Sequence, residues 1–455
     1  MSPEASVVRP LAGWGRFPIE TCRLYRPEKR ATLPAIFASG EEGSYIARGL
    51  GRSYGDAALN ASAGVIDFTR LDRMLGFDPE TAILECEAGV SLAAILEAFL
   101  PRGFFLPVTP GTRFVTVGGA IAHDVHGKNH HRVGTFSRFV LDFRLLTPVG
   151  EMLLCSPTEN PEVFRATVGG AGLTGLIVSA RIRLLPVESA FVRVDYRKAA
   201  NLDEALAALG ETDHLYEYSV AWIDGLAGGA SLGRSVLMQA NHALRGDLPA
   251  RAGDPLALRQ KGKGSVPFDL PAAVLNRVTV GAFNAAFYRW HPDGPGHLVD
   301  FASFFYPLDA ISHWNRLYGK RGFVQYQLLF PPGASRAGLT EILQRSSASG
   351  RGSFLGVLKR FGAAGEGMLS FPFAGYTLAL DLPAQNGLVP FLRELDRVVL
   401  DHGGRLYLAK DAAMTPATFA AMYPEADRFR QVQRRLDPRR LISSSLARRV
   451  GLLPV

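Results

Sequence analysis

Cysteine is scarce in this sequence, and long apolar segments are absent. The 455 residues include three cysteines, Cys22, Cys86 and Cys155, which lie far apart in the chain. They cannot form a disulfide framework, so we expect a reducing compartment. No segment approaches the ~20 apolar residues that a transmembrane helix requires, and the first residues lack the basic start and apolar core of a signal peptide. These absences predict a cytoplasmic protein without a membrane-spanning segment.

The charge of the chain favours acidic partners, because the net charge is +8. Nucleic acid is not expected, since no aromatic-interleaved or helix-turn-helix pattern accompanies the basic residues. A solvated helix face is the simpler interpretation of the densest basic stretch, and contact with a phosphate-bearing ligand or an anionic membrane surface is the alternative. That stretch comprises Arg428, Arg430, Arg434, Arg435, Arg439, Arg440, Arg448 and Arg449.

Length and pattern predict an α+β protein of roughly two to three domains. Up to about residue 188, strand-like runs such as 114–122 and 139–148 alternate with glycine-rich turns. One helix is predicted over 91–100, where apolar residues recur at helical spacing. Regular βαβ alternation, the pattern of a parallel sheet, is missing.

The character of the chain changes after Pro186. We expect helices over 199–209, 309–318 and 388–401, and strands over 216–224, 297–307, 322–330, 353–362 and 375–383. Residues 245–269 are rich in glycine, proline and basic side chains, which is typical of a lid or a disordered segment. The predicted units are 1–188, a substrate-facing domain over 189–405, and a C-terminal segment over 406–455.

The first glycine-rich loop spans residues 47–56 and follows a strand-like run. Its three glycines allow backbone N–H groups to turn toward a phosphate, while Arg48, Arg52 and Ser53 add charge and a donor. The spacing G-x-G-x-x-x-G differs from the dinucleotide-binding fingerprint, and no amphipathic helix follows. A plain tight turn explains this loop equally well.

Two more glycine-rich loops follow, over residues 110–129 and 168–177. Small residues at 118–120 leave room for a flat ligand against bare backbone, and Thr112 and Thr116 supply hydroxyl groups. Glycine is costly inside ordered structure. Three such loops in one region therefore indicate an extended ligand that carries a diphosphate.

These loops, with the segments GLGRSYGDAALN, PGTRFVTVGGAIAHDVHGKNHH, GFVQYQLLF and GGRLYLAKDAAMTPATFAAMYP, resemble the vanillyl-alcohol oxidase superfamily of PCMH-type FAD-linked oxidases. The resemblance covers nearly the whole chain. It implies a two-part FAD-binding domain over 1–188, a substrate domain with an antiparallel sheet flanked by helices over 189–405, and a segment over 406–455 that returns to the FAD domain. It also implies an FAD-dependent oxidoreductase that acts on a CH–OH group by hydride transfer to flavin N5.

The resemblance places the flavin contacts on the three loops and on one later tyrosine. Some superfamily members tether FAD through a histidine in the first loop, and this chain has Ser53 and Tyr54 there, so non-covalent FAD is expected. The implied cofactor-binding residues are Ala47, Arg48, Gly49, Leu50, Gly51, Arg52, Ser53, Tyr54, Gly55, Asp56, Ala57, Gly111, Thr112, Thr116, Val117, Gly118, Gly119, His123, Asp124, Val125, His126, Ala171, Leu176, Ile177 and Tyr407.

The resemblance also assigns roles around the substrate. Lys410 matches a proposed catalytic lysine, whose charge would stabilise the reduced flavin and whose amine, with a lowered pKa, would accept a proton. Tyr54 and His126 complete the implied catalytic set. The implied substrate residues are His126, Lys128, Gln327, Lys359, Thr377, Ala379 and Lys410. Thr377 and Ala379 stand where the family has asparagine and cysteine, so the shape of the pocket does not carry over with the chemistry.

Simpler interpretations exist for several of these residues. Four histidines at 123, 126, 130 and 131 resemble a metal cluster, but no H-E-x-x-H spacing or cysteine pair accompanies them, so no metal is expected. Lys128 taken alone would more often be a surface lysine, and for Lys359 an exposed lysine on a strand is about as frequent as a substrate contact. Gln327 shares one strand face with Gln325, which favours a pocket lining over a core.

Within the superfamily, the closest resemblance is to oxidases of the 2'-hydroxyl of a polyprenyl-phosphoryl ribose. Three lysines in the predicted pocket favour such a phosphorylated substrate. An alditol or aldonolactone oxidase is the first alternative; a non-catalytic nucleotide- or lipid-binding protein and a metal-dependent hydrolase are more distant ones. The implied partners are the sugar substrate, an NAD-dependent reductase that completes an epimerisation, and peripheral contact with the inner face of a membrane.

Overall fold

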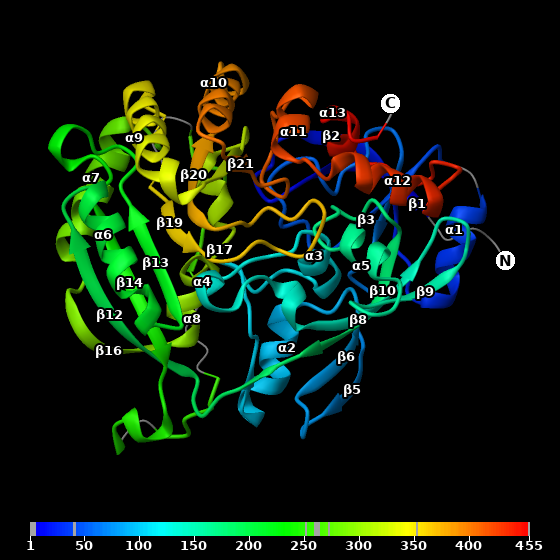
Figure 1. Ribbon diagram of the computed structural model, residues 1–455, viewed down its shortest axis with the longest axis horizontal. Helices are drawn as coiled ribbons and strands as arrows, with labels where there is room; N and C mark the ends of the chain where they lie inside the picture. Colours follow the sequence, from blue (N-terminus) through cyan, green and yellow to red (C-terminus); the bar gives the residue numbers. More distant parts are fainter. Residues whose placement is uncertain are drawn as a thin grey trace.

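The computed structural model describes residues 6–39, 42–250, 253–258, 264–271, 274–351 and 354–453. Two lobes lie side by side in it (Figure 1). The first lobe contains a four-stranded sheet in the order β1-β2-β4-β3 and a five-stranded antiparallel sheet in the order β5-β6-β10-β8-β9. Their bounds are β1 Ser6–Ala12, β2 Ile19–Tyr25, β3 Tyr45–Arg48, β4 Gly64–Asp67, β5 Met74–Asp78, β6 Ile83–Glu87, β8 Val140–Leu146, β9 Met152–Cys155 and β10 Leu176–Arg183.

The second lobe is built on an antiparallel sheet of eight strands in the order β16-β12-β14-β13-β19-β20-β18-β21. In β20, Leu378, Leu380 and Leu382 are buried on the face that helices α9 and α10 cover, whereas Ala379 points to the opposite face. The bounds are β12 Phe191–Ala199, β13 Tyr218–Ile223, β14 Ser235–His242, β16 Gly294–Asp300, β18 Phe323–Phe330, β19 Gly356–Phe361, β20 Gly375–Pro383, β21 Arg405–Leu406, α9 Pro332–Ser349 and α10 Leu388–Asp401. The α+β class is as predicted.

The C-terminal helices return to the first lobe (Figure 1). Helix α12 packs against α5, and the Ser445 N–H donates to the Leu59 carbonyl at 2.9 Å. The bounds are α5 Pro161–Thr167, α11 Pro416–Met422, α12 Ala426–Leu436 and α13 Ser445–Arg449. The predicted domain limits themselves stay a prediction.

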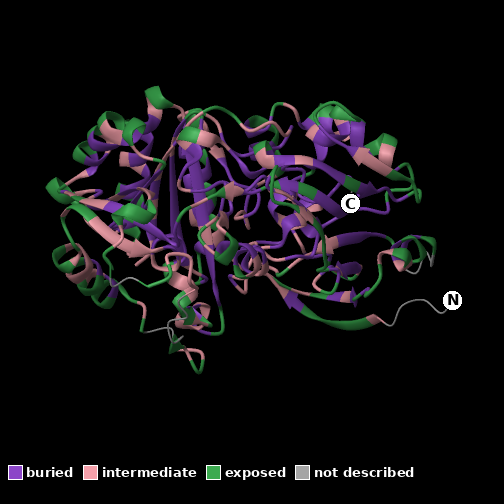
Figure 2. Ribbon diagram, turned by 90° about the horizontal axis from the view of Figure 1, so that it is seen from below, coloured by how far each residue is buried: buried purple, intermediate pink, exposed green. Residues whose placement is uncertain are grey.

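Buried residues concentrate in the sheets and between the lobes, while helices at the periphery carry the exposed residues (Figure 2). Several short elements connect the sheets. They are α1 Leu33–Ser39, α2 Leu92–Phe99, β7 Phe104–Phe105, α3 Val117–Ala122, α4 His130–Val133, β11 Leu185–Pro186, α6 Leu202–Thr212, β15 Gly264–Ser265, α7 Arg277–Trp290, α8 Phe301–Phe305 and β17 Ile311–Ser312.

Helices with a clear apolar spacing are confirmed. The helix predicted over 91–100 is α2, where Ser91 accepts a hydrogen bond from the Ala94 N–H at 3.1 Å and caps the N-terminus. The helix predicted over 388–401 is α10, with the same bounds. The helix predicted over 199–209 begins later, at α6, because Asn201 caps it.

Three predictions of secondary structure are wrong. The run 114–122 is not one strand, since Thr116 caps helix α3. Residues 309–318 form short 3-10 turns around β17, because His313 has φ of 57°, which interrupts a right-handed helix. The strand predicted over 297–307 ends at Asp300, whose side chain caps α8.

The predicted lid over 245–269 lies partly outside the described residues. Of its described part, residues 245–247 form a 3-10 turn, and β15 pairs in parallel with β17. Helix α7 follows and was not predicted. Asn276 begins it by accepting from two backbone N–H groups, of Val278 and Thr279.

Candidate active site

A cavity of about 810 Å³ lies between the glycine-rich loops of the first lobe and the open face of the eight-stranded sheet. Helix α7 contributes Val280, Phe283 and Phe287 to its wall. Ligand pockets commonly have volumes of roughly 300–1,000 Å³. This cavity is therefore the candidate active site.

The first glycine-rich loop is held against the segment 407–411. The Tyr54 N–H donates to the Ala409 carbonyl at 3.0 Å. A Cβ on Gly55 would overlap the carbonyl oxygen of Asp411. Glycine at position 55 therefore lets the two backbones approach closely enough to share one wall of the cavity.

The second glycine-rich loop contains the short helix α3. Thr116 begins the helix by accepting from the Gly119 N–H at 3.2 Å. Gly118, Gly119 and Ala122 line the cavity. Because none of these residues has a side chain larger than a methyl group, the helix presents nearly bare backbone to a ligand.

Lys410 lies over the ring of Tyr54, with Nζ 4.0 Å from the ring centroid. Burial lowers the pKa of Lys410 from 10.5 to about 7; the carboxylate of Asp381 opposes this shift, and the charge of Lys359 adds to it. The Lys410 side chain thus exchanges a proton near neutral pH. This is the property that a general base requires.

Two further lysines face the same cavity. Burial lowers the pKa of Lys359 to about 8, and burial together with Lys359 lowers the pKa of Lys128 to about 7. The Lys128 ammonium donates to the Phe304 carbonyl and lies 4.3 Å from the Phe304 ring centroid. Both lysines were predicted to contact substrate, and the surface alternative is wrong for both.

His126 is buried between the rings of Phe361 and Tyr407, at centroid distances of 4.8 and 5.2 Å. Burial, and next the charge of Lys359, hold its pKa well below 6.5, so the imidazole is neutral. The Gln327 amide donates to its Nε2 at 3.0 Å, which leaves the proton on Nδ1. Nδ1 is buried and has no partner in the described part of the chain.

Asp381 is a residue of the site that the sequence analysis did not single out. It lies two residues after Ala379 on the same face of β20, and it is fully buried. Its carboxylate accepts from the Gln325 amide at 2.7 Å, and burial raises its pKa to about 7. Period-two spacing from Ala379 was the signal that could have found it.

Family comparisons agree with this geometry. A model of an FAD binding domain matches residues 24–156, and a model of D-arabinono-1,4-lactone oxidase matches residues 382–450. The decaprenylphosphoryl-β-D-ribose oxidase of Mycolicibacterium smegmatis is 40% identical over 449 residues, which cover 97% of each chain.

The chain belongs to the decaprenylphosphoryl-β-D-ribose oxidase family. It is an FAD-dependent oxidoreductase, as predicted. Other relatives match about a third of the chain: the D-arabinono-1,4-lactone oxidase of Yarrowia lipolytica is 26% identical over 36% of this chain and 32% of its own. The Delta(24)-sterol reductase of Rattus norvegicus is 28% identical over 29% of this chain and 25% of its own.

The residues of this oxidase fit FAD. The three loops offer bare backbone along a cavity of about 810 Å³, and His126 Nδ1–H is a buried donor that needs a partner. The predicted cofactor residues that line the cavity are Ala47, Arg48, Gly49, Leu50, Gly51, Arg52, Ser53, Tyr54, Ala57, Gly111, Thr112, Thr116, Gly118, Gly119, His123, Val125, His126, Ala171, Ile177 and Tyr407. Their individual contacts with FAD stay a prediction.

Arg48 and Arg52, which were expected to add charge to the first loop, also contact groups of the protein. Arg48 donates to the carbonyls of Ala12 and Ala58, and the Arg52 guanidinium lies 3.9 Å from the ring centroid of Trp14. Both line the cavity, but these contacts fix their guanidinium groups to the protein.

Six predicted residues lie behind the cavity wall instead of on it: Gly55, Asp56, Val117, Asp124, Leu176 and Thr377. Val117 and Leu176 belong to the apolar core. The hydroxyl of Thr377 donates to the Leu328 carbonyl at 2.7 Å and accepts from the Gln327 amide at 3.2 Å. Thr377 therefore orients Gln327, whereas Ala379, on the same strand, faces the cavity.

Two absences concern the part of the chain that the structure describes. No group of three or more histidine, cysteine, aspartate or glutamate side chains is arranged to hold a metal ion there. Within the same residues, no helix has the length and apolar character needed to cross a membrane.

Proposed function

We propose that this oxidase acts on the 2'-hydroxyl of a polyprenyl-phosphoryl ribose. The observation that carries the proposal is the combination of three lysines, Lys128, Lys359 and Lys410, with apolar walls in one cavity. Lys410 acts as a neutral base, whereas the ammonium groups of Lys128 and Lys359 are costly in an apolar site unless an anion pairs with them. A phosphate on the substrate supplies that anion.

The apolar part of the wall favours a lipid over a small polyol. It runs from the sheet to α7 and includes Val220, Trp222, Val280, Phe283 and Phe287. Burial of apolar surface stabilises binding by about 25 cal/mol per Å². A prenyl chain gains from this surface, whereas a soluble alditol does not.

FAD, when bound, supplies the hydride acceptor of the reaction. The neutral amine of Lys410 accepts the proton of the substrate hydroxyl as its carbon loses hydride and becomes a carbonyl carbon. The Tyr54 ring supports the resulting ammonium by a cation–π contact. His126 Nδ1–H and the Gln327 amide are placed to orient polar groups of the ligands.

Anaerobic mixing tests this proposal. Flavin absorbance should bleach with a short-chain prenyl-phosphoryl ribose but not with free ribose, ribitol or an aldonolactone. Equal bleaching by the soluble polyols would instead support the second candidate, an aldonolactone or alditol oxidase, which the similarity of residues 382–450 to D-arabinono-1,4-lactone oxidase favours.

FAD should be bound without a covalent link. Ser53 and Tyr54 stand where superfamily members that tether FAD have histidine, and the Tyr54 ring packs edge-on against Phe323 at 5.3 Å. Acid precipitation should release all flavin into the supernatant. Flavin that stays with the precipitated chain would contradict the proposal.

The proposed product is a 2'-keto sugar, so an NAD-dependent reductase would complete an epimerisation. A membrane-bound lipid substrate also requires contact with the membrane, and α7 provides a surface for it at the cavity rim. Val278 and Trp290 are each 78% exposed, beside exposed Arg277 and Arg289. Such an arrangement suits the inner, anionic face of a bilayer.

Vesicle sedimentation tests this contact. Replacing Val278 and Trp290 with serine should weaken binding to anionic phosphatidylglycerol vesicles. Val149→Ser is the control, because Val149 is 52% exposed but lies between β8 and β9 of the first lobe and not on α7. Equal binding of all variants would contradict a role for α7.

A further inference from the structure

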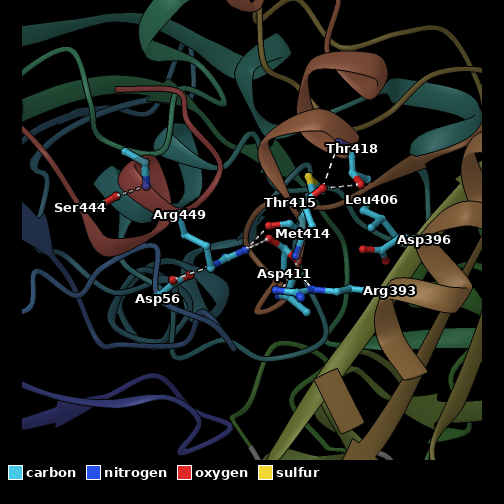
Figure 3. Close-up of polar contacts among 12 residues, drawn as sticks. Asp56, Arg393, Asp396, Leu406, Asp411, Met414, Thr415, Thr418, Ser444 and Arg449 are labelled. Atoms are coloured by element: carbon cyan, nitrogen blue, oxygen red, sulfur yellow. Dashed lines mark hydrogen bonds and ion pairs between the residues drawn. The ribbon is translucent and has the colours of Figure 1, made fainter. Parts of the chain in front are cut away.

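The C-terminal helix α13 carries Arg449, which contacts Asp56 and Asp411 (Figure 3). Its guanidinium forms a two-bond pair with Asp56, with Nε–Oδ2 at 2.8 Å and Nη2–Oδ1 at 2.7 Å. Nη1 donates to Asp411 Oδ2 at 2.8 Å and to the Met414 carbonyl at 2.9 Å. One guanidinium therefore joins two carboxylates whose side chains are each only 5% exposed.

The two carboxylates belong to the two segments that meet at the cavity. Asp56 follows Tyr54 by two residues, and Asp411 directly follows Lys410. Asp411 Oδ1 also accepts from the N–H groups of Ala413 and Met414, each at 3.0 Å, which fixes the turn after Lys410. The relative position of the Tyr54 ring and the Lys410 amine thus depends on how these segments are held together.

We infer that Arg449 is a positioning residue, which holds Lys410 over Tyr54 by binding Asp56 and Asp411 at once. This inference rests on the proposed role of Lys410. The planar guanidinium has N–H groups that point in different directions, so it can donate to both carboxylates at once. The ammonium of a lysine is a compact point charge that cannot make this two-sided set of hydrogen bonds. Without Arg449, the carboxylates are two like charges held close together with little solvent, and their repulsion separates the segments.

A merely structural role for Arg449 is the competing explanation, since the arginine also anchors α13. Its neighbour Arg448 provides the matched control. Arg448 donates to Asn60 Oδ1 at 2.7 Å and to the hydroxyls of Ser443 and Ser445 at 3.2 and 3.3 Å, and it makes no hydrogen bond to either carboxylate. Arg448→Met should loosen α13 while leaving Lys410 in place.

The test is the titration of Lys410 in the FAD-loaded protein. The chain has eight lysines, so NMR of protein labelled with 13C at lysine Cε resolves few signals, and Lys410→Arg identifies the one of interest. The wild-type midpoint is expected near pH 7. In Arg449→Lys and Arg449→Met, the midpoint of Lys410 should rise by about one pH unit or more. The reason is that the Lys410 amine becomes more exposed to water, so its pKa moves toward the ordinary value of lysine. Arg448→Met should keep the wild-type midpoint.

Arg449 variants that melt at lower temperature but keep the wild-type midpoint would overturn the inference. If Arg449→Met does not fold, the midpoint in Arg449→Lys tests the inference, because this variant keeps the positive charge and loses only the planar guanidinium. The proposed role of Lys410 fails separately, if Lys410→Ala reduces flavin at the normal rate. The NMR midpoint reports the effect of Arg449 whatever that rate is.

Discussion

Lys410 carries the chemistry at the scale of single residues. Lys410→Ala should bind FAD like the wild type but reduce it about 10²–10³ times more slowly, the usual cost of losing one well-placed electrostatic group. Stopped-flow absorbance after anaerobic addition of a prenyl-phosphoryl ribose measures this rate. Lys320→Ala, at an exposed lysine, is the control. A near-normal rate in Lys410→Ala would remove Lys410 from the mechanism.

The pKa of Lys410 sets the expected pH dependence. Because burial lowers that pKa to about 7, the amine is protonated and inactive below this pH, and the rate of flavin reduction should rise through about pH 7. Asp381 raises the pKa of Lys410, so Asp381→Asn should move the midpoint to lower pH. A flat profile, or a midpoint that rises in Asp381→Asn, would contradict this assignment.

Ala379 and Thr377 allow a test of the cavity wall. Ala379→Cys places a thiol on the wall, whereas Thr377→Cys places one behind it. The three native cysteines are buried. A small alkylating reagent should therefore modify Ala379→Cys in the FAD-free protein and spare Thr377→Cys, as intact mass measures. Modification of Thr377→Cys alone would contradict the placement of Ala379 on the cavity wall and of Thr377 behind Gln327.

The site residues found in the sequence were those that stand in extended motifs. Lys128 and Lys410 were found this way, but the motif also suggested Asp56 and Asp124, which lie behind the wall. Asp381 escaped notice because its period-two spacing from Ala379 places it on the cavity side of β20 without showing which group it faces. Its role depends on Lys410, which only the tertiary structure brings near.

At the scale of elements, residues 114–122 show why local pattern was insufficient. Their alternating valines favour a strand, yet Thr116 caps a helix and Gly118 packs against Ala88 from another part of the chain. By contrast, α10 was predicted with its observed bounds, since its apolar stripe is long and regular.

Gly55 lies where the first glycine-rich loop contacts the segment 407–411, and there is no room for a side chain at this position. Gly55→Ala should weaken FAD binding and slow flavin reduction together, because the new Cβ pushes the first loop away from Asp411. Fluorescence titration of FAD and the reduction rate measure the two effects. Gly76→Ala is the control, because a Cβ there has open space. Wild-type behaviour of Gly55→Ala would show that the two backbones can separate without harm.

At the scale of the whole molecule, the two lobes complete the cavity only together. The first lobe provides the bare backbone of the glycine-rich loops, and the eight-stranded sheet provides Gln327, Lys359 and Ala379. The sequence predicted both the α+β class and the location of the loops. It predicted that the C-terminal segment returns to the first lobe, but not that Arg449 of α13 pairs with Asp56, since that contact joins residues 393 positions apart.

The central claim is oxidation at the 2'-hydroxyl, and the fate of isotopic label tests it most directly. The measurement uses prenyl-phosphoryl ribose with deuterium at C2' or at C3', mixed anaerobically with the FAD-loaded protein, followed by mass spectrometry of the sugar product. Flavin should bleach with both substrates, and the product should lose the C2' deuterium and keep the C3' deuterium. A product that keeps deuterium at C2', or flavin that does not bleach, would contradict the claim.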